Sequence, residues 1–245
     1  MSLIREFQYL LNSLSNIVFL TGAGISTNSG LPDFRGDDGF WKTNKPIFFK
    51  DFVTSSSKRR DSWKRNLALH HKLSEIKPND GHHFVKRVLD QKEGSVITQN
   101  IDALHEKSGI LKEKIIEIHG NATKANCIEC GEIANIKLFH AAVENNEEFP
   151  NCLKCGGLVK VATISFGQSL NMKDFDKAKE LVQNTELLIV LGSSLQVQPV
   201  ASLINFLGAS SDLVIVNKDP TPFDTLASVV LHEDICNVVN QLQVS

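Results

Sequence analysis

The sequence has little net charge of either sign. It carries 26 Lys and Arg residues against 28 Asp and Glu residues, which gives a formal net charge of -2 over 245 residues. Because a protein that binds nucleic acid through its phosphates usually has a clear basic excess, direct nucleic-acid binding is not expected. Hydrophobic residues make up 42% and charged residues 22% of the chain, which is typical of a domain with a packed core.

The sequence also lacks a long apolar run. One of the longest, Leu187–Leu191, is far too short to cross a bilayer. Arg5 and Glu6 interrupt the N-terminal apolar residues, so no signal-peptide pattern is present there. We therefore expect no membrane partner and a cytoplasmic location.

Apolar runs of strand length alternate with helical patterns along most of the chain. The strand-like runs are rich in β-branched residues, and the helical patterns repeat apolar residues at three- and four-residue spacing. This alternation predicts an α/β fold with a Rossmann-like, doubly wound parallel sheet. The predicted strands are Ile17–Leu20, Val96–Thr98, Ile115–Ile118, Thr163–Phe166, Leu187–Leu191, Leu213–Val216 and Val229–Leu231.

Two segments interrupt the alternation. Residues 36–80 have helical spacing and no clear strand, and residues 121–160 contain four cysteines. We predict that these two insertions, one helical and one zinc-binding, together form a small lobe. The large lobe then consists of about residues 1–35, 81–120 and 161–245, and the whole chain, 1–245, is a single domain.

Four of the five cysteines form two C-x-x-C pairs, Cys127 with Cys130 and Cys152 with Cys155. Two such pairs on tight turns can build a tetrahedral sulfur cage that suits one structural Zn²⁺. Four thiolates fill the coordination shell, so a catalytic zinc is not expected. Two disulfides are the alternative, which the expected reducing compartment disfavours.

A glycine-rich turn follows the first predicted strand. Gly22, Ala23 and Gly24 are small enough to let backbone N–H groups approach a pyrophosphate. Thr27 stands where the dehydrogenase fingerprint has its third glycine, so hydride transfer loses support.

The polar loop after this turn ends in Asp33, Phe34 and Arg35. An ordinary surface loop is one interpretation. An aromatic ring beside a cation gains little on a surface, whereas a pocket for a charged aromatic ring and a phosphate uses both. We favour the pocket, with Asp33 either capping a turn or facing the ligand.

Polar residues also follow other predicted strands at the point where each strand ends. Ligands of open α/β sheets bind beyond the carboxyl ends of the strands, so we expect these residues to share one site. His119 is among them, and near neutral pH an imidazole can take a proton from a sugar hydroxyl. The other groups are Gln99, Asn100, Ile101 and Asp102, then Gly192, Ser193 and Ser194, and then Asn217 and Lys218.

In their order and spacing, these motifs resemble those of the sirtuin family over nearly the whole chain, in the form of a small, bacterial-type, single-domain member. The resemblance implies NAD⁺ as a co-substrate between the two lobes, one structural zinc, and acyl-lysine proteins or peptides as partners. The expected activity is NAD-dependent protein-lysine deacylation, which releases nicotinamide and O-acyl-ADP-ribose.

The same resemblance implies a role for each matching residue. His119 is the expected general base, and Asn100 and Asp102 complete the expected catalytic set. Ile164, Phe166 and Gly167 are expected to bind the acyl-lysine substrate. The expected NAD⁺ contacts are Gly22, Ala23, Gly24, Thr27, Asp33, Phe34, Arg35, Gln99, Asn100, Ile101, Asp102, His119, Gly192, Ser193, Ser194, Asn217, Lys218 and Ile235.

The chain departs from the family pattern at Val161 and Gln168, where Pro and Glu are usual, which affects the expected peptide preference. Desuccinylating members carry a Tyr and an Arg where an ungapped register places Asn66 and Leu69 here. The sequence therefore predicts a neutral acyl group, acetyl first.

Two other functions compete with deacylation. One is protein ADP-ribosylation on the same scaffold. The other is a non-enzymatic zinc module that binds nucleic acid, which would leave His119 and Asp102 without a task.

Overall fold

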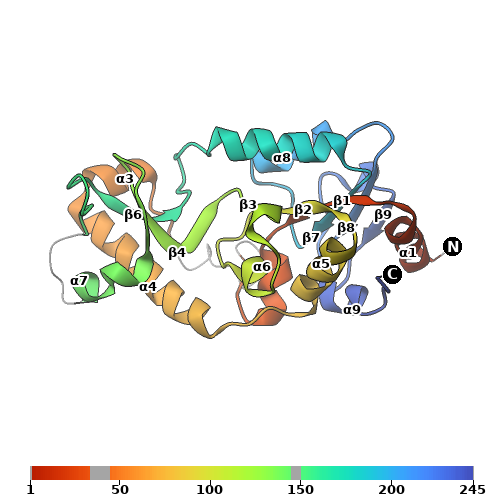
Figure 1. Cartoon of the computed structure of the whole chain (residues 1–245), viewed down its shortest axis with the longest axis horizontal. Coiled ribbons are helices and arrows are strands. Elements are labelled where there is room, and N and C mark those ends of the chain that lie inside the picture. The colour runs from red at the N-terminus through yellow and green to blue at the C-terminus, as the bar shows by residue number, and fades with distance from the viewer. Residues whose placement is uncertain (1, 34–44, 145–149, 245) are drawn as a thin grey trace.

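The computed structural model describes residues 2–33, 45–144 and 150–244. The described chain is elongated, with a large sheet at one end and a smaller lobe at the other (Figure 1). Among the described helices, none is both long and apolar enough to cross a membrane.

The larger sheet has six strands in the order β3-β2-β1-β7-β8-β9, and every neighbouring pair is parallel. All five residues of β7 are buried, as expected for a parallel strand that is covered on both faces. The strands are β1 (Asn16–Thr21), β2 (Glu93–Thr98), β3 (Ile115–Glu117), β7 (Leu187–Leu191), β8 (Asp212–Val216) and β9 (Val229–Leu231). The predicted fold class is confirmed.

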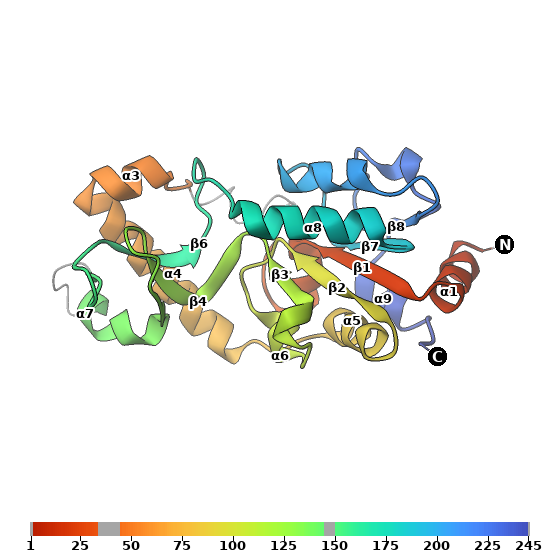
Figure 2. The ribbon, with the colours of Figure 1, turned by 45° about the horizontal axis from the view of Figure 1, so that its top comes forward.

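Successive side chains of β1 enter different cores. Ile17 and Phe19 pack in one hydrophobic cluster, and Val18 and Leu20 pack in another, because neighbouring strand residues point to opposite faces. The first face is covered by α1 (Leu3–Ser13), α5 (Asp80–Gln91) and α9 (Ile235–Val239), and the second by α8 (Met172–Asn184) and the 3₁₀ helix η4 (Val200–Phe206). Figure 2 shows α8 lying along the sheet.

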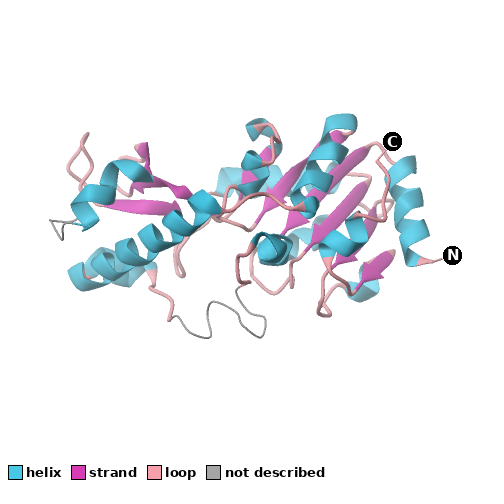
Figure 3. Cartoon of the chain, turned by 90° about the horizontal axis from the view of Figure 1, so that it is seen from below, coloured by secondary structure: helices cyan, strands magenta, loops and turns pink. Residues whose placement is uncertain are grey.

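The small lobe combines the two insertions around one core. Its antiparallel sheet has the order β5-β4-β6, and helices from the first insertion pack on it. Trp63 is only 1% exposed and its Nε1 donates to Val159 O at 3.1 Å. The elements are β4 (Gly120–Cys127), β5 (Ile133–Asn135), β6 (Val159–Thr163), α3 (Phe49–Thr54), α4 (Ser56–Glu75) and α7 (His140–Glu144). In Figure 3 this lobe projects from one side of the parallel sheet. The exact residue bounds of the two lobes remain a prediction.

The predicted strand Thr163–Phe166 is wrong in extent and in place. The strand present is β6, which ends at Thr163 and pairs antiparallel with β4 instead of joining the large sheet. The sequence pattern placed the start of this strand too late, because a lysine usually marks an exposed position. Here Lys160 is buried, and its ammonium donates to Val161 O at 3.1 Å within the small lobe. After β6 the chain turns, and the side chain of Gln168 accepts from Ser165 N at 3.1 Å.

The remaining short elements join these parts. They are η1 (Ala23–Ser29), α6 (Leu104–Lys107), η2 (Lys112–Lys114), η3 (Ile136–Phe139) and η5 (Asp224–Leu226). The element of greatest consequence is η1, since it begins directly beyond β1, at the point where the order of the sheet reverses between β1 and β7. Such switch points are the usual ligand sites of open α/β sheets.

Gly94 allows β2 to lie beside β1. Its φ is +138°, and a Cβ there would stand 1.8 Å from Ile17 O, in the backbone of the neighbouring strand. We expect Gly94→Ala to lower the free energy of unfolding by about 3 kcal/mol or more in urea denaturation. Gly30→Ala is the control, since φ is +92° there but no atom lies within 4 Å of the added Cβ. It should cost only about 1–2 kcal/mol, and equal costs would contradict a backbone clash at Gly94.

Candidate active site at the edge of the large sheet

The loops that follow β1 and β7 touch through glycines. A Cβ on Gly22 would stand 2.6 Å from Gly192 O, and a Cβ on Gly24 would stand 2.7 Å from Gly192 Cα. Gly24 N donates to Gly192 O at 2.9 Å, and Gly22 N donates to Leu191 O at 3.1 Å. The amides of Gly22 and Gly24 are thus bonded within the protein. The main reason for glycine at both positions is that a side chain would prevent the two loops from touching.

Asn100 and Asp102 lie beneath this contact and are both buried. Asn100 Nδ2 donates to Gly22 O at 3.0 Å and to Ser26 Oγ at 3.2 Å. Ser26 Oγ donates in turn to Asp102 Oδ2 at 2.7 Å, and Asp102 Oδ1 accepts from Leu104 N at 2.9 Å. Burial raises the pKa of Asp102, and these hydrogen bonds oppose the shift. The side chains predicted at the end of β2 are therefore joined to those after β1.

His119 ends the loop after β3 and is half-buried. Its Nδ1 lies 3.1 Å from Gln99 O, and since a carbonyl oxygen only accepts, Nδ1 carries the hydrogen. The neutral ring then has its lone pair on Nε2, which is the form a base needs. Gln99 Nε2 donates to Ser193 Oγ at 3.2 Å, so the ends of β2, β3 and β7 form one connected group.

The segment predicted to bind acyl-lysine adjoins His119. Ile164 N donates to His119 O at 2.8 Å, so the residue predicted as the base is bonded through its backbone to this segment. Phe166 is 42% exposed, and its ring lies 6.1 Å from that of Phe48. Gly167 follows with a φ of +76°, which turns the chain away.

The predicted residues after β8 reach the same edge through Asp234. Lys218 Nζ lies 3.4 Å from Asp234 Oδ2, and Asn28 Nδ2 of η1 donates to Asp234 Oδ1 at 3.0 Å. Asp234 also caps α9, whose first residue is the buried Ile235. Asn217 Nδ2 donates to Asp219 O at 2.7 Å and so stays within its own turn.

Fewer contacts link the other predicted residues to this group. Thr27 Oγ1 donates to Gly24 O at 3.0 Å, and Ile101 O accepts from Ala122 N at 2.9 Å. Ala23, Ser194 and Asp33 are half-buried. The predicted positions Phe34 and Arg35 lie outside the described residues.

The sequence interpretation missed a buried polar network behind this edge. Thr21 and Thr98 pair in register, and Thr21 Oγ1 donates to Thr98 Oγ1 at 2.9 Å. His105 Nε2 lies 2.9 Å from Thr21 Oγ1, and His82 Nε2 lies 3.5 Å from Ser26 Oγ. A threonine at the last position of both β1 and β2 was the available signal, whereas nothing in the local sequence relates the two histidines to it.

Both histidines of the network are neutral when the protein is folded. Burial lowers the pKa of His105 to about 4 and that of His82 to about 2, with the neighbouring His105 and His83 adding to the shift at His82. The unfolded chain protonates near the ordinary value of 6.5 and so binds more protons below it. Stability should therefore fall as pH falls below 6.5.

We expect the free energy of unfolding to decrease from pH 7 to pH 5, with each histidine approaching about 1.4 kcal/mol per pH unit. His105→Gln should make this decrease smaller, because the suppressed protonation of His105 is lost and the shift that His105 adds at His82 is lost with it. Urea denaturation at both pH values measures this. Identical pH dependence in the variant and the wild type would contradict a buried, neutral His105.

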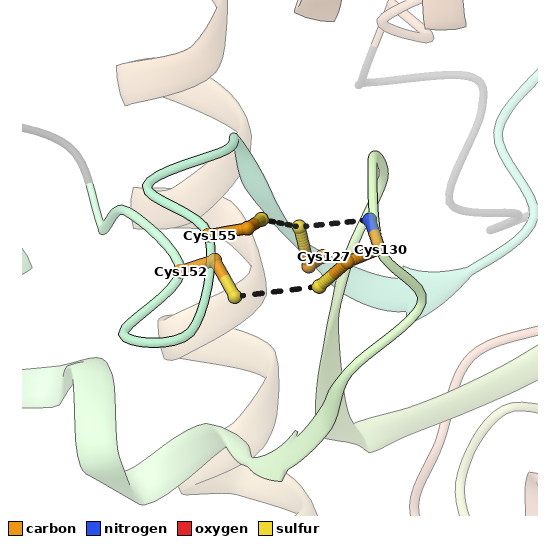
Figure 4. Close-up of side chains that lie close together, drawn as sticks. All are labelled: Cys127, Cys130, Cys152 and Cys155. Atoms are coloured by element: carbon orange, nitrogen blue, oxygen red, sulfur yellow. Dashed lines mark hydrogen bonds between the residues drawn. The ribbon is translucent and has the colours of Figure 1, made fainter.

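The four paired cysteines lie at one centre in the small lobe (Figure 4). The Sγ atoms of Cys127 and Cys155 are 3.5 Å apart, and those of Cys130 and Cys152 are 3.6 Å apart. A disulfide needs about 2.05 Å, whereas four sulfurs at about 2.3 Å from one Zn²⁺ stand about 3.8 Å apart. The thiols therefore fit a structural zinc, with each C-x-x-C pair facing the other across the centre.

Loss of this zinc should loosen the small lobe. We expect Cys152→Ser to abolish zinc retention and to raise hydrogen exchange in β4 and β6, since the metal joins the turns that extend from them. Cys236→Ser is the control, because this fifth cysteine lies in α9 on the other lobe. Metal analysis and exchange by mass spectrometry test this, and full protection of β4 in zinc-free protein would contradict it.

Known protein sequences are similar to this chain over nearly its whole length. Residues 22–199 match the model of the Sir2 family. The chain is 40% identical over 236 residues to an NAD-dependent protein deacetylase of Rhodopseudomonas palustris, with 95% of this chain and 92% of the relative covered. It is 41% identical over 221 residues to NAD-dependent protein deacetylase 1 of Bradyrhizobium diazoefficiens, covering 89% and 87%.

Solved structures of Sir2 proteins are similar to this chain over nearly its whole length. A Sir2 protein in complex with a p53 peptide and NAD⁺ has a TM-score of 0.84 and 33% identity, with 97% of this chain and 96% of that chain covered. A Sir2 protein bound to a propionylated peptide has a TM-score of 0.85 and 33% identity, with 98% and 97% covered.

Proposed function

The chain belongs to the Sir2 family and is an NAD-dependent protein deacetylase, and we propose that His119 is the base that takes a proton from a ribose hydroxyl of NAD⁺. One observation carries this proposal. His119 is hydrogen-bonded through Nδ1 to the Gln99 loop and through its backbone oxygen to Ile164, so it lies between the two predicted binding segments.

When bound, NAD⁺ supplies a ribose carbon that accepts the acyl oxygen as nicotinamide departs. For this the chain must hold the nicotinamide end firmly and leave His119 Nε2 able to accept a proton. The Nδ1–H bond to Gln99 O serves the second need, because it fixes both the tautomer and the tilt of the ring.

Asn100 and Asp102 are proposed to hold the nicotinamide end. Asn100 uses both amide hydrogens on Gly22 O and Ser26 Oγ, so it can offer a ligand only its side-chain oxygen. Asp102 is fixed by Ser26 and Leu104 and is likewise an acceptor when ionised. Two buried acceptors suit a carboxamide, whose NH₂ group donates two hydrogen bonds.

The segment after β6 is proposed to bind the acyl-lysine peptide. Ser165 N donates to the Gln168 side chain, and Phe49 N donates to Phe166 O at 2.9 Å. Neither bond belongs to a strand ladder, so an entering extended peptide can replace them with strand-like bonds. The family's usual Glu is here Gln168, whose side-chain oxygen closes this turn without adding a negative charge.

We propose a neutral acyl group, acetyl first. Asn66 and Leu69 both lie on α4; Asn66 Nδ2 donates to Ser62 O at 2.8 Å and Leu69 packs against the small-lobe core. Neither offers a cation to an acidic acyl chain. The one tyrosine of the sequence, Tyr9, lies on α1, which covers the large sheet. A cytoplasmic location is also proposed, supported by the four-thiol cluster, which needs a reducing compartment.

The proposed base is tested by His119→Ala with NAD⁺ and an acetyl-lysine peptide. Nicotinamide and O-acetyl-ADP-ribose are followed by mass spectrometry. We expect product formation to fall by about 10² to 10⁴, the usual contribution of a general base, with zinc content and melting temperature unchanged. His83→Ala is the control, since His83 is exposed on α5.

Wild-type turnover by His119→Ala would remove this residue from the mechanism. Transfer of label from NAD⁺ onto protein without any need for acyl-peptide would support ADP-ribosylation instead. In a panel of peptides, faster turnover of succinyl-lysine than of acetyl-lysine would contradict the proposed acyl preference.

A further inference from the structure

A second group of metal-ligating side chains lies on the small lobe, away from the four cysteines. It consists of His71 on α4 and of His140 and Glu144 on α7. One ligand atom from each residue lies within 4.8 Å of the other two. His71 Nε2 and Glu144 Oε1 are 3.5 Å apart, and their side chains are 60% and 57% exposed.

The packing of α7 determines which of its residues face α4. Phe139, the last residue of η3, and Val143 of α7 are four residues apart and enter the small-lobe core, where the Phe139 ring lies 5.7 Å from that of Trp63. His140 and Glu144 form the next pair at the same spacing, so they share the adjacent face of the helix. The anchored pair therefore holds the polar pair beside His71.

The imidazoles of this cluster are available as ligands. His140 Nε2 is buried and has no hydrogen-bond partner among the described residues, so that nitrogen is not used to hold the lobe together. The His140 ring lies 5.2 Å from that of His71 and 5.0 Å from that of His70. Burial lowers the pKa of His140, with the His71 ring adding to the shift, and the neutral imidazole is the form that binds metal.

We propose that His71, His140 and Glu144 form a second binding site for a divalent transition-metal ion, with Zn²⁺ as the preferred occupant. Two imidazole nitrogens and one carboxylate are a ligand set that zinc accepts, with water completing a tetrahedron. Ligand atoms at about 2.0–2.2 Å from a tetrahedral ion stand about 3.3–3.6 Å apart, and the His71–Glu144 pair already has this spacing. Rotation of the exposed His71 and Glu144 side chains can shorten their distances to the His140 nitrogen, which are within 4.8 Å, to this spacing.

The ligand types also exclude other common ions. Mg²⁺ and Ca²⁺ prefer oxygen ligands, whereas imidazole favours the ions late in the first transition series. With three protein ligands and an exposed position, this site should bind more weakly than the four-thiolate centre. An ion there would join α4 to α7, two helices that pack on the same core as the cysteine-bearing strands.

The number of zinc ions per chain tests the proposal. Full-length protein that retains its thiolate-bound zinc is dialysed against increasing free Zn²⁺. We expect a second equivalent to bind, and expect His71→Gln and Glu144→Gln each to weaken it by about tenfold or more. His232→Gln should leave it unchanged, because His232 lies in the other lobe, 3.2 Å from Asp224 Oδ2 through Nε2 and 3.0 Å from Asn217 O through Nδ1. One zinc per chain throughout, or a second zinc retained by both cluster variants, would overturn the proposal.

Cobalt distinguishes the ligands. Zinc-loaded protein titrated with Co²⁺ should develop weak visible absorption without the intense near-ultraviolet band of thiolate ligands, and His140→Gln should abolish it. An intense thiolate band at the first equivalent would show exchange at the cysteines and would count against a nitrogen and oxygen site. Melting curves recorded without added metal check that each variant is folded.

Discussion

The close contact between the loops after β1 and β7 is the constraint on which the site depends. Gly22, Gly24 and Gly192 leave no room for a Cβ between the two backbones. The polar residues that follow β2 bond to this contact, Asn100 through Gly22 O and Gln99 through Ser193 Oγ. Because neighbouring parallel strands end at one edge, a contact between two loops brings side chains from three strands together.

A second constraint joins the two lobes at His119. The chain leaves β3 of the parallel sheet at Glu117, and His119 directly precedes Gly120, the first residue of β4 in the antiparallel sheet. Gly120 has a φ of +79°, and a Cβ there would stand 2.0 Å from Ala162 O, so only glycine fits beside β6. The imidazole that is proposed to act on the ribose is thus carried at the junction between the nucleotide-binding and zinc-binding parts.

Much of this was predictable because the chemistry is local in the sequence. The apolar runs of the central strands, the spacing of the cysteines and the polar residues at strand ends each follow from a few neighbouring residues. What could not be predicted depends on tertiary packing. Lys160 is buried in β6, although its charge suggested an exposed position outside a strand. His82 and His105 are far from the site in sequence, and only the tertiary fold brings them beside Ser26 and Thr21. Ser26, which links Asn100 to Asp102, looked like one polar loop residue among several.

The central claim is that the His119 imidazole faces the sugar that bears nicotinamide. The most direct measurement is a crystal structure with a non-cleavable NAD⁺ analogue and an acetyl-lysine peptide. The account predicts that His119 Nε2 lies about 2.6–3.2 Å from a ribose hydroxyl, or one water away, while Nδ1 keeps its bond to Gln99 O. An imidazole turned away from the ribose, or a dinucleotide bound elsewhere than at the ends of β1, β2 and β7, would contradict it.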